Sequence, residues 1–159
     1  MFRREEGTST VEFALVAPVL LLLLVGILDL GRAVNAYVTV SSAAREGSHY
    51  AILHPTAAPS AIASAVRARV SPLNPCLVSV TSSYYNGSTF TAWPLGGVPA
   101  SSPAPSAIPV RVSVSYPWSA ATFIGRFFPA GSAPPSNAPC PWPSATAYFQ
   151  ASSTSDTNR

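Results

Sequence analysis

The chain has 159 residues, of which 48% are hydrophobic and only 9% charged, and its formal net charge is +3. This length suits one membrane helix and one small domain, whereas a soluble domain usually carries about 25% charged residues. All positive side chains are arginines, and they form no basic cluster, which argues against nucleic acid as a partner.

Residues 1–7 form a short leader-like segment with two arginines and two glutamates. An uncharged apolar run follows from residue 13 to residue 28, and with its more polar flanks the predicted span covers residues 8–30. A helix of this length measures about 34 Å, which exceeds the roughly 30 Å of a bilayer core. Because the run has no polar face, we expect a transmembrane helix in contact with lipid, not the core helix of a soluble protein.

Apolar and small residues continue at helical spacing through residues 31–54, and the His54-Pro55 pair ends the pattern. The sequence therefore predicts one helix that leaves the membrane and reaches about Leu53. A secretory signal peptide is the rival interpretation, because a signal peptide also has a basic start followed by an apolar core. In that case Val34-Asn35-Ala36 would serve as the cleavage site.

The two cysteines give the clearer indication of orientation. Two arginines and the terminal amine precede the span, while Arg32 and Arg45 follow it, so the positive-inside signal is modest. Cys76 and Cys140 lie well beyond the span. Two cysteines in an exported domain read most simply as one disulfide, and the alternative is two reduced buried thiols in a cytosolic domain. We expect a cytoplasmic N-terminus and an extracytoplasmic domain, anchored in the cytoplasmic (inner) membrane.

Glu12 stands at the edge of the apolar run. A charged residue deep in a membrane helix costs roughly 2.5–3.5 kcal/mol on insertion scales, and such residues often mark function. Near the interface, however, a carboxylate reaches water cheaply. The position of Glu12 alone favours neither reading.

The string from Gly7 to Phe13 resembles the processing site of type IV prepilin-like proteins. There a dedicated membrane peptidase cuts after the glycine and leaves glutamate as the fifth mature residue. The first 50 or so residues resemble the TadE family, minor pilins or pseudopilins of the tight-adherence (Flp) pilus system. The resemblance rests on Gly7, Val11-Glu12-Phe13-Ala14, Pro18, the Leu run, Gly26 with Asp29, Gly31-Arg32, Ala43-Ala44-Arg45-Glu46-Gly47 and Tyr50-Ala51.

The resemblance implies cleavage between Gly7 and Thr8 by a prepilin peptidase, and other pilus or pseudopilin subunits as partners beside the lipid bilayer. Cleavage would free an amine on Thr8, one helical turn from Glu12. A carboxylate in lipid needs a cation, either this amine or that of a neighbouring subunit. The Ala43–Gly47 segment is expected to serve packing, with Arg45 and Glu46 on its polar side.

Residues 55–151 are expected to form a small α+β domain in the pilin-like manner, with a short antiparallel sheet and Pro-rich loops. The predicted elements are a helix from Ser60, as N-cap, to Val70, strands at 77–81, 88–93, 110–116 and 145–150, and a hairpin turn at Asn86-Gly87. Two Pro-rich stretches, 98–109 and 129–143, are predicted loops, and residues 152–159 a disordered tail.

Aromatic side chains are abundant for so small a domain. They are expected to fill its core, and the alternative is an exposed patch for a partner subunit. The residues are Trp93, Trp118, Phe123, Phe127, Phe128 and Trp142.

The chemistry of an enzyme is hard to find in this sequence. No Ser-His-acid set can be drawn, because Asp156 is the only acid after Glu46. His49 and His54 are five residues apart and do not share a helix face, and with two distant cysteines they lack a zinc spacing. Asn86-Gly87-Ser88 matches a glycosylation sequon but is explained by the turn. We expect no catalytic residue, metal site or cofactor, and no small-molecule substrate is evident.

Two classes of function remain. The favoured one is a structural pseudopilin placed in, or priming, a pilus. The runner-up is an uncleaved single-pass protein that binds an extracytoplasmic partner. A secreted hydrolase has little support.

Overall fold

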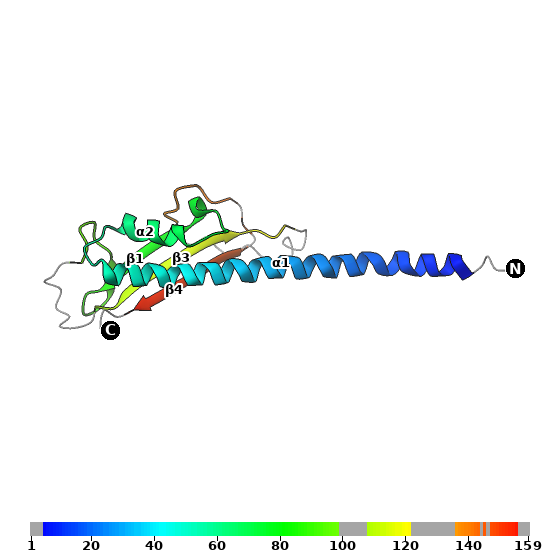
Figure 1. Cartoon of the computed structure of the whole chain (residues 1–159), viewed down its shortest axis with the longest axis horizontal. Coiled ribbons are helices and arrows are strands. Elements are labelled where there is room, and N and C mark those ends of the chain that lie inside the picture. The colour runs from blue at the N-terminus through cyan, green and yellow to red at the C-terminus, as the bar shows by residue number, and fades with distance from the viewer. Residues whose placement is uncertain (1–4, 99–107, 122–135, 144, 146, 156–159) are drawn as a thin grey trace.

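The computed structural model describes residues 5–98, 108–121, 136–143, 145 and 147–155. The long helix α1 (Glu5–Leu53) runs through Pro18 without a break, and its N-terminal half extends well beyond a small domain (Figure 1). The remaining elements are α2 (Pro59–Ala68), the 3-10 turn η1 (Pro75–Leu77), β1 (Ser79–Tyr85), β2 (Phe90–Ala92), β3 (Val110–Trp118) and β4 (Ala147–Ser155). The predicted α+β class, with one long N-terminal helix and a small antiparallel sheet, is confirmed.

The four strands form one antiparallel sheet in the order β2-β1-β3-β4. Helix α1 contacts β3 and β4, and α2 contacts α1 and β1, so both helices cover the same face of the sheet (Figure 1). The predicted hairpin joins β1 to β2. Its Gly87 has a φ of 99°, a conformation that glycine adopts without steric cost. The side chain of Asn86 accepts the N–H groups of Ser88 and Thr89 at 3.1 and 2.9 Å.

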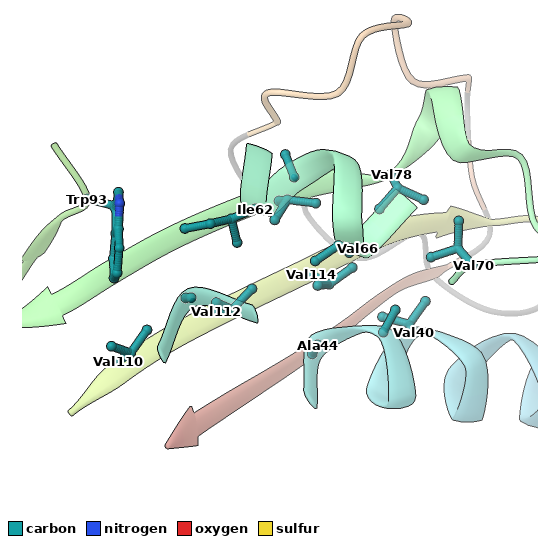
Figure 2. Close-up of a cluster of buried hydrophobic side chains, with 14 residues drawn as sticks. Val40, Ala44, Ile62, Val66, Val70, Val78, Trp93, Val110, Val112 and Val114 are labelled. Atoms are coloured by element: carbon teal, nitrogen blue, oxygen red, sulfur yellow. The ribbon is translucent and has the colours of Figure 1, made fainter. Parts of the chain in front are cut away.

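The core lies between the two helices and this sheet face (Figure 2). Strict alternation along β3 points Val110, Val112 and Val114 toward the helices, and all three are buried. They meet mostly small or branched side chains from both helices, from β1 and from the segments that flank these elements. These are Val40, Ala43, Ala44 and Ala51 of α1, Ile62, Ala63 and Val66 of α2, and Val70, Val78, Val80 and Trp93.

Small residues let α1 approach the sheet closely. Ser48 is buried, and its Oγ donates to the carbonyl oxygen of Arg45 at 2.9 Å. The same oxygen lies 3.0 Å and 3.1 Å from the hydroxyls of Ser153 and Ser155 on β4. Buried hydroxyls are tolerated when they bond to one another, so this serine cluster joins α1 to the C-terminal end of β4.

The Ala43–Gly47 segment has the packing role expected of it. Ala43, Ala44 and Gly47 are buried, whereas Arg45 is exposed. Glu46 lies on the outer side of the helix and forms an ion pair with Arg69 at 3.2 Å.

Replacing Gly47 by Ala should lower the free energy of unfolding by up to about 2 kcal/mol. A Cβ at this position would lie 2.5 Å from Val66 Cγ2 and 3.0 Å from Val112 Cγ1, and both valines are fully buried. Overpacking costs about 1–3 kcal/mol and outweighs the roughly 1 kcal/mol of helix propensity that alanine gains. Gly31→Ala is the matched control, because nothing lies within 4 Å of a Cβ there. Denaturant unfolding of both variants in detergent measures the difference, and equal stabilities would contradict this packing role.

Several predicted boundaries are wrong. Strand β4 runs to Ser155, so residues 152–155 are part of the sheet and not of the predicted disordered tail. The domain therefore extends past residue 151. Helix α2 begins at Pro59, and its N-cap is Ala58 without a side-chain bond, not Ser60, because proline suits the first helical position. The first strand starts two residues later than predicted and ends at Tyr85. Most of the two Pro-rich stretches lies outside the described residues.

Candidate functional site

The N-terminal half of α1 is the most unusual surface of the molecule. Its side chains from Val11 to Leu24 are exposed, except the half-buried Ala17, although most are large and apolar. A soluble protein rarely shows so much contiguous apolar surface, whereas lipid solvates it well. Within the described part of the chain, this is the one helix long and apolar enough to cross a membrane. The chain therefore has the form of a single-pass membrane protein anchored near its N-terminus.

The predicted processing residues lie in the first turn of α1, and this end of the helix is far from the domain (Figure 1). Gly7 and Thr8 are both exposed, and nothing lies within 4 Å of the position where Gly7 would carry a Cβ. Glu12 is exposed one turn further on. Its carboxylate has no hydrogen bond or ion pair with any part of the chain that the structure describes. All three residues are thus exposed among the residues that the structure describes.

Asp29 marks the point where the domain begins to cover α1. Its side chain is buried, and its Oδ1 accepts the N–H of Ala121 at 3.3 Å, just after β3 ends. Arg32 lies 3.6 Å from the same carboxylate, one turn along the helix. These contacts hold the segment that follows β3 against the helix directly after the apolar run.

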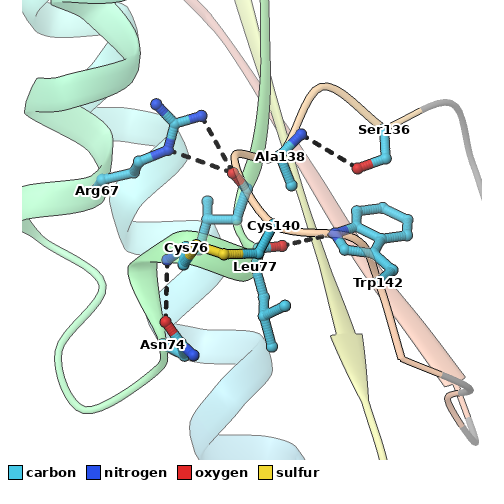
Figure 3. The surroundings of a disulfide bond; sticks show 9 residues. Arg67, Asn74, Cys76, Leu77, Ser136, Ala138, Cys140 and Trp142 are labelled. Carbon is cyan, nitrogen blue, oxygen red and sulfur yellow. Dashed lines mark hydrogen bonds between the residues drawn. A yellow bond between two sulfur atoms is a disulfide. The ribbon is translucent and has the colours of Figure 1, made fainter.

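A disulfide joins Cys76 in η1 to Cys140, with the two Cα atoms 5.4 Å apart (Figure 3). Hydrogen bonds also join the two segments that carry these cysteines. Cys140 N–H donates to the carbonyl of Cys76 at 3.1 Å, and Trp142 Nε1 donates to that of Leu77 at 2.7 Å. Arg67 of α2 donates to the carbonyl of Val78 from Nε and Nη2, at 3.4 and 3.3 Å. Partial burial lowers the pKa of this guanidinium from its usual value.

Segment 136–143 also covers part of the β1 edge that β2 does not reach. Asn137 Oδ1 accepts the N–H of Val80 at 2.9 Å, and its Nδ2 donates to the carbonyl of the same residue. Ser79 Oγ donates to the same Oδ1 at 2.8 Å. The carboxamide thus pairs with β1 as a neighbouring strand would, which blunts an open sheet edge.

The two histidines lie near the end of α1 and have ordinary surroundings. His54 stacks on Tyr50 with ring centroids 4.4 Å apart, and His49 is exposed. Among the described residues, no three His, Cys, Asp or Glu side chains gather as metal ligands would.

Residues 7–49 match the family model described as TadE-like protein. The chain carries a TadE-like segment. This match confirms the resemblance seen in the first 50 or so residues of the sequence. No curated protein and no solved structure matches the chain.

The TadE-like segment coincides with most of α1. It contains the predicted processing residues, Glu12, the apolar run, Asp29 and the packing glycine Gly47. The sheet and the disulfide lie outside it. In the sequence, Asp29 stands out only as part of the family pattern, and nothing marks Asn137 or Ser48. No local signal could have found these two, because their partners are 57 and more than 100 residues away.

The six aromatic residues divide between different surroundings. Trp93 is in the core, as expected, and donates its Nε1–H to the carbonyl of Ala57 at 2.8 Å. Trp118 and Trp142 are half-buried at the other end of the sheet. Phe123, Phe127 and Phe128 lie outside the described residues.

Proposed function

We propose that this chain is a pseudopilin, a membrane-anchored structural subunit of a tight-adherence (Flp) pilus system. The observation that carries the proposal is the match of the TadE-like segment to a helix whose apolar half no other described element covers. A helix of this kind can lie in lipid first and pack against other subunits later. The function is one of assembly and requires no chemistry from the outer domain.

The proposed orientation places the N-terminus in the cytoplasm and the domain outside the inner membrane. The Cys76–Cys140 disulfide supports it, because such bonds persist in oxidising compartments. A prepilin peptidase then reaches the exposed Gly7–Thr8 bond from the cytoplasmic side.

Glu12 has a specific part in the proposed assembly. Cleavage after Gly7 creates an ammonium group on Thr8, about 6 Å along the axis from Glu12. The carboxylate of one subunit then pairs with the amine of its neighbour as their helices bundle. This pairing offsets the cost of desolvating each charge and sets the relative height of the two helices.

The mature chain should begin at Thr8. Mass spectrometry of the N-terminus, on protein from a strain that carries the peptidase, measures this directly. A strain without the peptidase provides the control and should retain residues 1–7. An intact Met1 or Phe2 in the first strain would contradict the proposal and favour the uncleaved, anchored binding protein. A start at Tyr37 would identify residues 1–36 as a signal peptide.

A further inference from the structure

Three aromatic side chains meet where the sheet first lies against α1. We call Tyr37 of α1, Trp118 of β3 and Phe149 of β4 the membrane-proximal cluster. The Tyr37 and Phe149 rings lie edge to face at 6.2 Å, and those of Trp118 and Phe149 are 5.7 Å apart. Phe149 pairs with Tyr116, and Trp118 lies two residues further along β3. Residues two apart on a strand point to the same face, so the rings of Trp118 and Phe149 both lie on the sheet face that α1 covers.

The height of this cluster along α1 suits the surface of a bilayer. Tyr37 follows Glu12 by 25 residues, which is about 37 Å of helix. With Glu12 at the inner edge of a hydrocarbon core about 30 Å thick, Tyr37 lies about 7 Å beyond the outer edge. Helical side chains lean toward the N-terminus, so its ring comes closer still, within the headgroup layer.

The polar tips of the cluster are left without partners in the described part of the chain. Trp93 and Trp142 each donate their indole N–H to a backbone carbonyl, whereas Trp118 has no such bond. The hydroxyl of Tyr37 has none either, and this side chain is 51% exposed. Tryptophan and tyrosine with an apolar body and an unbonded polar tip are typical of membrane interfaces.

The exposed apolar surface of α1 also continues past the apolar run to the level of the cluster, through Leu30, Val34 and Val38. The side chain of Arg32, on the same stretch, is 61% exposed and can reach a phosphate. This surface is continuous with the candidate membrane span, so the neighbour it would meet first is the lipid headgroup layer.

We propose that the membrane-proximal cluster inserts into the headgroup layer of the outer leaflet and binds phospholipid. The domain then rests on the bilayer, and the cluster fixes the height of α1 in the membrane. At that height Glu12 stays hydrated at the inner surface until a neighbouring subunit's amine replaces the water. Lipid binding does not depend on the pilus role, and it would hold equally for an anchored binding protein.

The test uses the full-length protein in phospholipid vesicles that contain lipid brominated on the upper acyl chain, which quenches nearby tryptophans. Trp118→Phe should remove at least half of the quenchable emission. The matched control, Trp93→Phe, changes a core tryptophan far from the cluster and should leave that emission intact. Tyr37→Trp in the otherwise unchanged chain should increase it, which keeps the test decisive if Trp118→Phe folds poorly.

Unchanged quenching in both Trp118→Phe and Tyr37→Trp would overturn the proposal. The proposal would also be overturned if neither brominated lipid nor aqueous acrylamide quenched Trp118, and if this protection increased with the protein-to-lipid ratio. That result would place a second copy of the chain over the cluster in place of lipid. Mapping of the Cys76–Cys140 bridge and near-ultraviolet circular dichroism establish that each variant is folded.

Discussion

Replacing Glu12 by Gln should abolish pilus production while the protein still inserts in the membrane. The amide is cheaper to place in lipid than a carboxylate, so insertion is unchanged or improved. Cleavage after Gly7 should also proceed, because the peptidase signal lies mainly in that glycine and the apolar run. Assembly then buries the ammonium group of Thr8 without a counter-charge, and breaking one partner of a buried ion pair typically costs 3–5 kcal/mol. A penalty of that size at every subunit contact stops assembly.

Pilus yield and co-purification with other pilus subunits measure the effect, with the membrane level of the protein checked in parallel. Glu46→Gln is the matched control on the same helix. Glu46 pairs with Arg69 at the surface of the domain, 3.2 Å away, and exposed pairs of this kind contribute at most about 1 kcal/mol. Normal pili in the Glu12→Gln strain at normal protein levels would contradict the assembly role and favour the anchored binding protein.

Removing the disulfide with the double variant Cys76→Ser/Cys140→Ser should lower the free energy of unfolding by about 4 kcal/mol. The bridge spans a sequence separation of 64 residues, and the entropy of closing such a loop gives this figure. A small domain has only about 5–15 kcal/mol in total, so the unbridged chain should be partly unfolded at physiological temperature.

Denaturant unfolding of the full chain in detergent, followed by tryptophan emission, measures this loss. Trp142→Phe is the control for local packing, because it removes the 2.7 Å bond to the carbonyl of Leu77 but leaves the bridge. One such hydrogen bond contributes about 1 kcal/mol. If both variants lose the same stability, the bridge adds nothing beyond its surroundings. Free thiols in protein prepared under a thiol block would show that it does not form.

The features predicted correctly are those whose cause lies within a short stretch of chain. The apolar run allows no structure but a helix once it is in lipid, because every backbone group must bond within the segment. The alternation in 110–116 places the valines of β3 on one face, and Asn86-Gly87 selects a tight hairpin. With only two cysteines in the chain, one pairing was available.

The full extent of strand β4 could not be predicted from local sequence. Its helix-facing residues after Phe149 are Ala151, Ser153 and Ser155, which look like a polar tail because serine is usually exposed. Ser153 and Ser155 are held against α1 by the hydroxyl of Ser48, about a hundred residues earlier in the chain. Small residues on both elements allow a close approach, and bonded hydroxyls replace the apolar contacts that a sequence pattern would reveal.

The sequence alone therefore establishes the membrane helix, the TadE-like segment and the α+β class, because these depend on local composition and spacing. The strand order, the reach of β4, the pairing of Asn137 with the edge of β1 and the burial of Asp29 follow only from the folded chain. The last three of these join groups more than 50 residues apart, and the free energy that selects them arises only when both partners lose water together. The same is true of the membrane-proximal cluster, whose three aromatic rings come from three different elements.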